Sequence, residues 1–211
     1  MDLVLHAIEV RVLGSLLEKE ITTPEYYPLS LNALVNACNQ KSNRDPMVSY
    51  DDDTVDRALA SLRDKGLLLS VSGAGSRVKK YGHRLSESLN LGRRELAILC
   101  ELMLRGPQTL GELKNRADRM HHFDDLAEIE SVIERHGELI TKLPRRAGEK
   151  EPRYAHLLSG APALPAEEEA HHEAPATHPD RIGVLEEEVA RLRAELEDLK
   201  QQVAAFRRQF E

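Results

Sequence analysis

The sequence predicts a mainly α-helical protein with small β-hairpins (α+β class): two tandem winged-helix domains followed by a C-terminal coiled-coil helix. Two observations carry this prediction. Three amphipathic helices followed by one β-hairpin, which is the winged-helix pattern, occur twice along the chain. A strict heptad pattern of apolar residues then fills the C-terminal segment. The predicted parts are two domains at residues 1–88 and 89–159, a linker at 160–180 and a coiled coil at 181–211.

The first copy begins with apolar residues at helical spacing from Leu5 to Leu17, which predict a helix that ends near Glu20. Ser30 is a suitable N-cap for a second helix. The aspartates at 51–53 offer N-caps for a third helix, which Gly66 ends in the left-handed conformation. Two apolar runs on either side of a Gly- and Ser-rich turn, residues 67–71 and 78–85, predict the hairpin.

The second copy has the same order of elements. A helix around residues 96–103 ends at Gly106, and Thr109 with Glu112 forms a capping box for the next helix. Asp124 or Asp125 opens the third helix, which is expected to end at Gly137. Residues 139–143 and 153–158 predict a second hairpin around a charged turn.

The two copies differ in the length of one connection. Ser30 and Gly66 are 36 residues apart, whereas Thr109 and Gly137 are 28 residues apart. The first copy therefore carries about eight extra residues between its second and third helices. This insertion is the polar segment Asn39–Pro46.

The C-terminal part combines a flexible linker with a helix. Residues 160–180 are rich in Ala, Pro, Glu and His, as flexible acidic linkers are. Mostly β-branched residues at heptad position a and Leu at position d favour a parallel homodimer, and a helix that folds back on its own domain is the alternative. The predicted dimerisation residues are Ile182, Leu185, Val189, Leu192, Leu196, Leu199, Val203, Phe206 and Phe210.

Composition limits the function classes. The net charge of -7 comes from the tail, since residues 161–211 hold 6 basic and 12 acidic side chains and the rest is close to neutral. With no Trp and only three Phe, stacking platforms for single-stranded nucleic acid are not expected. Cys38 and Cys100 lie on apolar helix stripes, which suits a reducing compartment. Because neither a signal peptide nor a membrane-spanning run is recognisable, we expect a cytoplasmic protein without a membrane partner.

No sequence motif indicates an enzyme. The chain has no phosphate-binding loop, no Gly-x-Ser-x-Gly elbow, no HExxH and no CxxC. The adjacent His121 and His122 would point about 100° apart on a helix, which disfavours a shared metal ion. We therefore expect a non-enzymatic protein with no cofactor and no metal.

Candidate nucleic-acid contacts lie in three segments of the first copy, because cationic and amide side chains bind phosphates and base edges. They are Arg77, Lys79, Lys80 and Arg84 in the hairpin, Arg57, Ser61 and Arg63 in the third helix, and Asn39, Gln40, Lys41, Asn43 and Arg44 in the insertion. The hairpin and the insertion also have simpler interpretations. Hairpin charges can be a solvated edge that prevents strand pairing, and the amides of the insertion can cap the second helix.

Acidic residues argue against DNA. Three carboxylates open the third helix of the first copy, at the end that would approach a duplex. The third helix of the second copy is more acidic still, so the second copy is not expected to bind DNA. Two partners therefore remain open: double-stranded DNA, as for a transcription regulator, and another protein, as for an adaptor similar to the chromosome-condensation accessory subunits of this architecture.

The chain also resembles the YceH-like family of uncharacterised bacterial proteins. The resemblance is carried by residues 9–19, 22–25 and 27–34, and most specifically by the run ACNQKSNR at Ala37–Arg44. It extends over essentially the whole chain, through Gln108–Leu113 and Arg153–Leu157 among other stretches. The family implies paired winged helices and a coiled-coil tail, and it implies no established activity.

Overall fold

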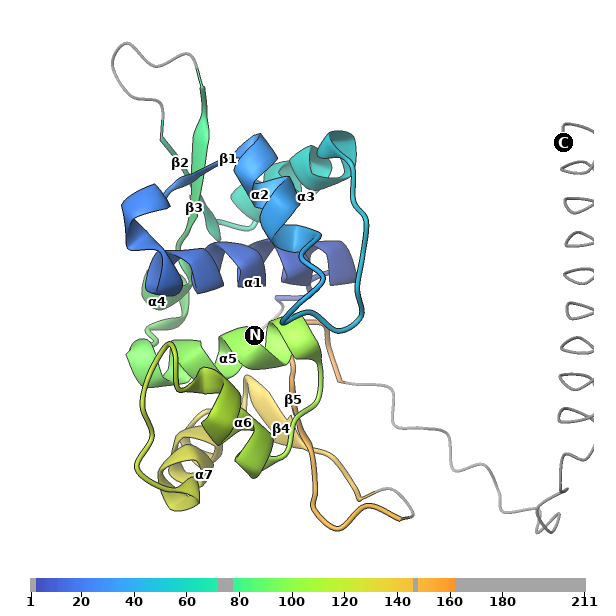
Figure 1. Cartoon of the computed structure of the whole chain (residues 1–211), viewed down its shortest axis with the longest axis vertical. Helices are drawn as coiled ribbons and strands as arrows, with labels where there is room; N and C mark the ends of the chain where they lie inside the picture. Colours follow the sequence, from blue (N-terminus) through green and yellow to red (C-terminus); the bar gives the residue numbers. More distant parts are fainter. Residues whose placement is uncertain (1–2, 72–77, 146–147, 162–211) are drawn as a thin grey trace, which may run out of the picture. The chain divides into compact units, whose positions relative to one another are not determined.

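The computed structural model describes residues 3–71, 78–145 and 148–161, which belong to one structural unit, residues 1–164. These residues form seven α-helices and two small antiparallel sheets, a mixed α and β fold (Figure 1). The predicted heptad helix, nearly all of the predicted linker and the tip of the first hairpin lie outside the described residues. No helix among the described residues is long and apolar enough to cross a membrane.

The first half of this unit contains three helices and a three-stranded sheet with the strand order β1-β3-β2. Ser30 Oγ accepts a hydrogen bond from the Ala33 amide (3.3 Å), and Asp51 Oδ1 accepts one from the Thr54 amide (2.8 Å), which confirms both predicted N-caps. Gly66 has the predicted positive φ of 72°. The elements are α1 (Ala7–Thr22), the 3-10 turn η1 (Pro24–Tyr26), β1 (Leu29–Ser30), α2 (Leu31–Cys38), α3 (Asp52–Asp64), β2 (Leu68–Val71) and β3 (Lys80–His83).

The second half follows a similar order, with an additional short helix at its start and a sheet of two strands. Thr109 and Glu112 form the predicted capping box, with N···O distances of 3.0 and 3.2 Å. Asp125 caps the last helix, which ends at Arg135, two residues before Gly137, just as α3 ends two residues before Gly66; unlike Gly66, Gly137 does not have a positive φ. The elements are α4 (Leu85–Leu89), α5 (Arg93–Arg105), α6 (Leu110–Ala117), α7 (Leu126–Arg135), β4 (Ile140–Lys142) and β5 (Tyr154–His156).

One bridge shows how closely the halves correspond. Gln108, directly before the N-cap of α6, exchanges two backbone hydrogen bonds with Tyr154 of β5 (3.0 and 2.7 Å). In the first half, β1 lies directly before α2 and pairs with β3 in the same way, with Leu29 opposite Tyr81. In the second half, a single bridge thus occupies the position that strand β1 has in the first half.

Three elements differ from the sequence prediction, and the first of them is the short helix α4, which was not predicted. The strand expected to reach Leu85 ends at His83, because the Leu85 amide donates to His83 Nδ1 (3.1 Å) and α4 begins there. The two-residue strand β1 was not predicted, because it is defined only by its pairing with β3.

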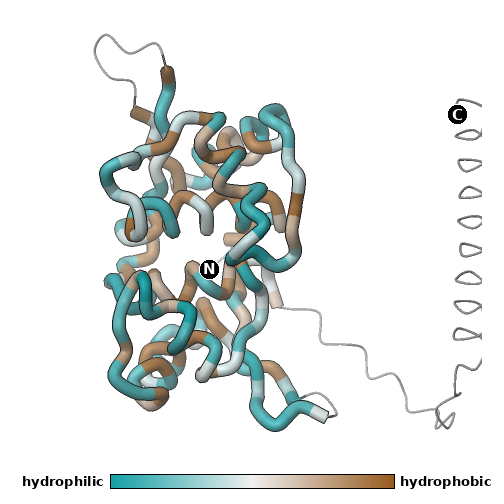
Figure 2. The backbone as a smooth tube through the Cα atoms, viewed as in Figure 1, coloured by the Kyte–Doolittle hydropathy of each residue, from teal (hydrophilic) through white to brown (hydrophobic). Residues whose placement is uncertain are grey.

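Helices α1 and α5 lie together in the middle of the unit, with α2, α3 and the first hairpin on one side and α6, α7 and the second hairpin on the other (Figure 1). Ten consecutive residues of α1, Glu9–Glu18, are buried. A Cβ atom on Gly14 would lie 3.0 Å from Leu104 Cδ2 and 3.2 Å from Met103 Cβ, so the glycine permits the close approach of α1 to α5. One cluster of buried hydrophobic residues therefore extends through both halves, and the helices carry hydrophobic residues (brown in Figure 2) among hydrophilic ones.

Candidate nucleic-acid interface

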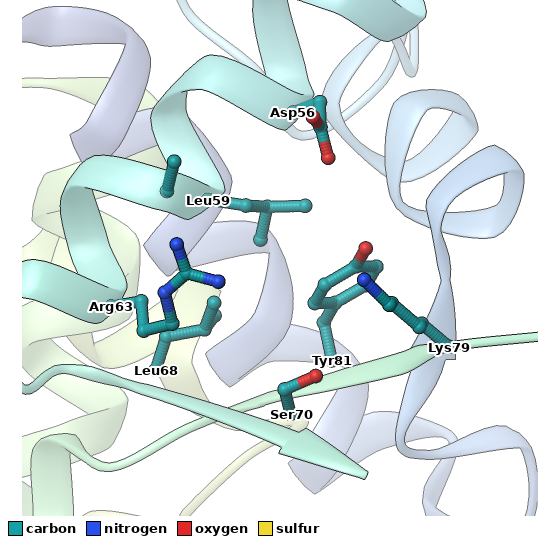
Figure 3. Close-up of a pocket in the computed structure, with 8 residues that line it drawn as sticks. Asp56, Leu59, Arg63, Leu68, Ser70, Lys79 and Tyr81 are labelled. Atoms are coloured by element: carbon teal, nitrogen blue, oxygen red, sulfur yellow. The ribbon is translucent and has the colours of Figure 1, made fainter. Parts of the chain in front are cut away.

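A small groove lies between α3 and the first hairpin, with a volume of about 140 Å³. Figure 3 shows side chains from both elements directed into it. Helix α3 contributes a carboxylate and a guanidinium, and the hairpin contributes a hydroxyl, an ammonium and a phenol. The lining residues are Asp56, Leu59, Ala60, Arg63, Leu68, Ser70, Lys79 and Tyr81.

The hairpin places its lysines in solvent. Lys79 lines the groove and Lys80 follows it in β3, and neither forms an ion pair with any residue that the structure describes. Arg84 is exposed and pairs with Glu87 at 2.9 Å, a contact of the surface type that is worth little. Arg77 of the prediction lies outside the described residues.

The three candidates on α3 differ in orientation. Arg63 lines the groove, and its nearest carboxylate is the exposed Asp64 at 3.9 Å. Arg57 is exposed and lies 3.4 Å from Thr54 Oγ1. Ser61 is half-buried and directed toward α1, where its hydroxyl contributes to the lowered pKa of Glu9. Ser61 is therefore removed from the groove-facing candidates.

Carboxylates border the groove at the start of α3. Asp52 and Asp53 are exposed at the start of α3, next to the cap Asp51. Hydrogen bonds from Thr54 lower the pKa of Asp51, so this end of the helix stays anionic. Burial, together with the negative charge of Asp56, raises the pKa of Tyr81, which keeps its phenol protonated as a hydrogen-bond donor. Arg63 of α3 and Lys79 of the hairpin supply the positive charge of the groove, and Asp56 is the one carboxylate among its lining residues.

The insertion, predicted as a nucleic-acid contact, is mostly bound inside the fold. The Asn39 side chain donates to the Tyr50 carbonyl and accepts from the Tyr50 amide, both at 2.8 Å. Gln40 Oε1 accepts from Arg44 (3.0 Å), and Asn43, at a positive φ of 59°, accepts from Arg105.

Arg44 is the clearest correction, because its side chain is fully buried. It donates to Glu18 Oε2 (2.6 Å) and to the Ala37 carbonyl (2.8 Å), so it cannot contact a phosphate. The alternative interpretation, in which the insertion caps helix α2 and holds the loop, describes these contacts. Among the insertion candidates, Lys41 alone is exposed.

Glu18 and Arg44 belong to a network of charges that joins the two halves; Glu18, Arg44 and Glu101 are buried in it and Arg119 is partly exposed, and we call it the buried ion network. Glu18 also pairs with Arg119, which lies after α6 and reaches Glu101 of α5 at 3.4 Å. Glu101 Oε2 is 2.8 Å from Arg105 Nε. The members of the network are Glu18, Arg44, Glu101, Arg105 and Arg119.

The two carboxylates of the network differ in their titration. Burial raises the pKa of Glu18, but hydrogen bonds and charge from Arg44 and Arg119 outweigh it, and the resulting pKa is below the usual value. Burial raises the pKa of Glu101 above the usual value, despite Arg105 and Arg119 nearby. Sequence reasoning missed both glutamates, and the available signal was a charged residue inside an apolar run, as in LLEKE and LCELML.

Both cysteines are buried, as their positions on apolar stripes predicted. Burial raises the pKa of the Cys38 thiol to about 11 and that of Cys100 well above its usual value. Thiols of this kind are chemically inert. Within residues 3–71, 78–145 and 148–161, no three His, Cys, Asp or Glu side chains are placed to hold a metal ion.

Comparisons with known proteins all point to one family. Residues 5–149 match the family described as "Protein of unknown function, DUF480". A "UPF0502 protein" of Solibacter usitatus is 54% identical over 215 residues, which cover 100% of both chains. Another, from Pelobacter propionicus, is 54% identical over 220 residues with the same coverage, and one from Citrifermentans bemidjiense is 57% identical over 93% of this chain and 90% of its own. The chain therefore belongs to the DUF480 family, whose bacterial relatives carry the name UPF0502.

Proposed function

We propose that this chain is a dimeric, tandem winged-helix protein that binds double-stranded DNA, in the manner of a transcription regulator. One observation carries the proposal. From Gly66 to Ser86 the sequence contains four basic side chains and no acidic one, and the described part of this hairpin flanks the groove beside α3. A basic hairpin next to a helix is suited to phosphate contact along a duplex.

The element order supports the winged-helix interpretation. Helix, short strand, two helices and hairpin follow one another in the first half, and the three strands form a β1-β3-β2 sheet. The bridge between Gln108 and Tyr154 supports the same interpretation for the second half. The resemblance to the YceH-like family points in the same direction.

The proposed contact is the hairpin end of the groove in the first half. Lys79 and Arg63 line the groove and would neutralise phosphates there, and Lys80 would do so from the other face of the hairpin, whereas the carboxylates at the start of α3 would repel phosphates. Such a contact is largely independent of base sequence, because phosphates carry no sequence information. Two copies joined through the predicted C-terminal coiled coil would strengthen it by avidity.

The test is a binding titration with duplex DNA on a double variant, Lys79→Ala with Lys80→Ala. Each lost phosphate contact flattens the dependence of log affinity on log salt by about 0.9, and both lysines are present twice in a dimer, so the magnitude of the slope should decrease by roughly 3.6. The matched control is Lys142→Ala with Arg145→Ala, which removes two exposed cations from the second hairpin. An equal or larger effect of the control pair would contradict the choice of the first hairpin.

A second candidate function is that of a protein adaptor, and a specific observation favours it. The first hairpin exposes three aliphatic side chains, Leu69, Val71 and Val78, to 47%, 40% and 56%. Exposed aliphatic groups on one element are typical of protein-binding surfaces. If the chain does not bind duplex DNA at low salt, the adaptor becomes the preferred function, to be pursued by pull-down.

For either partner we propose a cytoplasmic, non-enzymatic protein that needs no cofactor. The two buried thiols suit a reducing compartment. The described residues form grooves and ion pairs, and we propose no catalytic nucleophile or general base among them.

A further inference from the structure

Strand β2 is an edge of the sheet in the first half. The order β1-β3-β2 places it outermost, and among the described residues its backbone pairs with β3 alone. The other side of the strand presents unpaired N–H and C=O groups, which are a template for a further strand.

The described part of this edge lacks the side chains that commonly prevent pairing. Natural edge strands are blunted by lysine, proline or inward-pointing charges. Residues 66–76 contain no charged residue and no proline. The hairpin lysines all lie on the β3 side, with Lys80 opposite Val71.

The exposed aliphatic groups lie on one face of the edge strand. Leu69 and Val71 alternate with Leu68 and Ser70, which face α3 and line the groove. Figure 2 shows hydrophobic residues (brown) at both ends of the chain that border the grey tip of the hairpin. A strand added to β2 would cover the outer aliphatic groups as well as the free backbone groups.

We propose that the added strand is β2 of a second copy of this chain, paired antiparallel about a two-fold axis near Ser70. Leu69 would then lie opposite Val71 of the partner subunit, and the reciprocal pair would form by symmetry. The two sheets would join into one, in the order β1-β3-β2-β2-β3-β1. The proposal goes beyond DNA binding and does not depend on it.

Charge and symmetry select a second copy over a foreign strand. A neutral apolar strand favours neither an acidic nor a basic partner, and an antiparallel edge is complementary to itself, so one contact satisfies both free edges. The nearest charges do not oppose it. Lys80 and its symmetry mate would be three strand spacings apart, roughly 14 Å. That separation exceeds the screening length of about 8 Å at physiological salt.

The size of the contact defines when it forms. Four residues on each side bury much less than the roughly 800 Å² per partner of a typical stable interface. The pairing is therefore a second contact inside a dimer that is already joined, and the predicted coiled coil would supply that connection. Tethering by a flexible linker gives an effective concentration on the order of millimolar.

Cysteine cross-linking of the full chain tests the pairing. The sequence has two cysteines, both buried, so the native chain gives a clean background. Opposed residues of an antiparallel pair have Cβ atoms about 5 Å apart, within reach of a short bifunctional thiol reagent. S70C should give covalent dimer as its main product. The control S131C is on the exposed face of α7 and should give little.

A second variant separates pairing from random collision. Leu69→Lys with Val71→Lys, in the S70C background, places like charges opposite each other, and it should abolish the covalent dimer. Both positions are exposed, so the fold should tolerate the change. Cross-linking of S70C no stronger than that of S131C, or cross-linking that survives both lysines, would overturn the proposal. If S70C forms the covalent dimer but the chain does not bind duplex DNA, only the proposed DNA-binding function is refuted.

Discussion

Arg44 lies in a polar stretch of the sequence, yet its guanidinium is buried against a carboxylate 26 residues earlier in the chain. Arg11 of α1 donates to the carbonyls of Cys38 (3.2 Å) and Pro46 (2.6 Å), at the two ends of the same insertion. Composition correctly marks these residues as strong hydrogen-bond formers. It cannot show that Arg44 points into the fold, because this orientation depends on Glu18 and Arg11, and only the tertiary fold brings these two residues close to the insertion.

Arg44→Ala should lower the free energy of unfolding by about 3 kcal/mol, because it leaves the buried Glu18 with one cation fewer. Lys41→Ala is the matched control, since Lys41 is an exposed cation of the same insertion and should change stability by less than about 0.5 kcal/mol. Urea denaturation of the two variants measures both values. Equal effects would mean that the buried ion network does not stabilise the fold.

His156 gives a prediction for pH. Burial lowers its pKa to about 4, from a usual value of 6.5. The unfolded chain therefore binds a proton on this imidazole at a higher pH than the folded chain does. The stability that follows is present above pH 6.5 and is lost as the pH falls through about 4.

His156→Gln should therefore flatten the decrease in the free energy of unfolding between about pH 6.5 and about pH 4. Denaturant unfolding of both proteins across this interval is the measurement. The same pH dependence in the variant and the wild type would show that other groups cause the acid sensitivity.

At the scale of elements, the local chemistry of caps was predictable and the pairing of short strands was not. Ser30, Asp51, Thr109 and Asp125 cap helices as expected, because each cap involves residues within four positions. Strand β1 depends on β3, about fifty residues away, so no local pattern could indicate it. The same reasoning applies to the groove: its basic hairpin was predicted, whereas the orientation of Ser61 toward Glu9 was not.

The crossing of α1 and α5 makes a prediction at this scale. Gly14→Val adds methyl groups where a Cβ alone would lie 3.0 Å from Leu104, so the helices must move apart. The free energy of unfolding should fall by about 1–3 kcal/mol, the usual cost of overpacking. Gly111→Ala in α6 is the control, because its nearest neighbour is 4.0 Å away. There the gain in helix propensity should raise stability by up to about 1 kcal/mol. An unchanged stability of the Gly14 variant would mean that this contact is not tight.

At the scale of the whole molecule, the predicted coiled coil decides the oligomeric state. Removal of the chain from Arg181 onward should convert a dimer into a monomer, because it removes all nine heptad residues. Light scattering near micromolar concentration distinguishes the two masses. A dimer that survives the deletion would place the interface elsewhere, and a monomeric full chain would favour the helix that folds back on its own domain.

DNA binding is the central claim, and the affinity of the full chain for random duplex DNA as a function of salt tests it most directly. The proposed phosphate contacts of Lys79, Lys80 and Arg63, present twice in a dimer, predict a linear fall of log affinity with log salt and a slope of about -5. A random duplex suffices, because phosphate contacts do not depend on base sequence. Absence of binding at low salt, or an affinity that does not change with salt, would contradict the account and favour a protein partner.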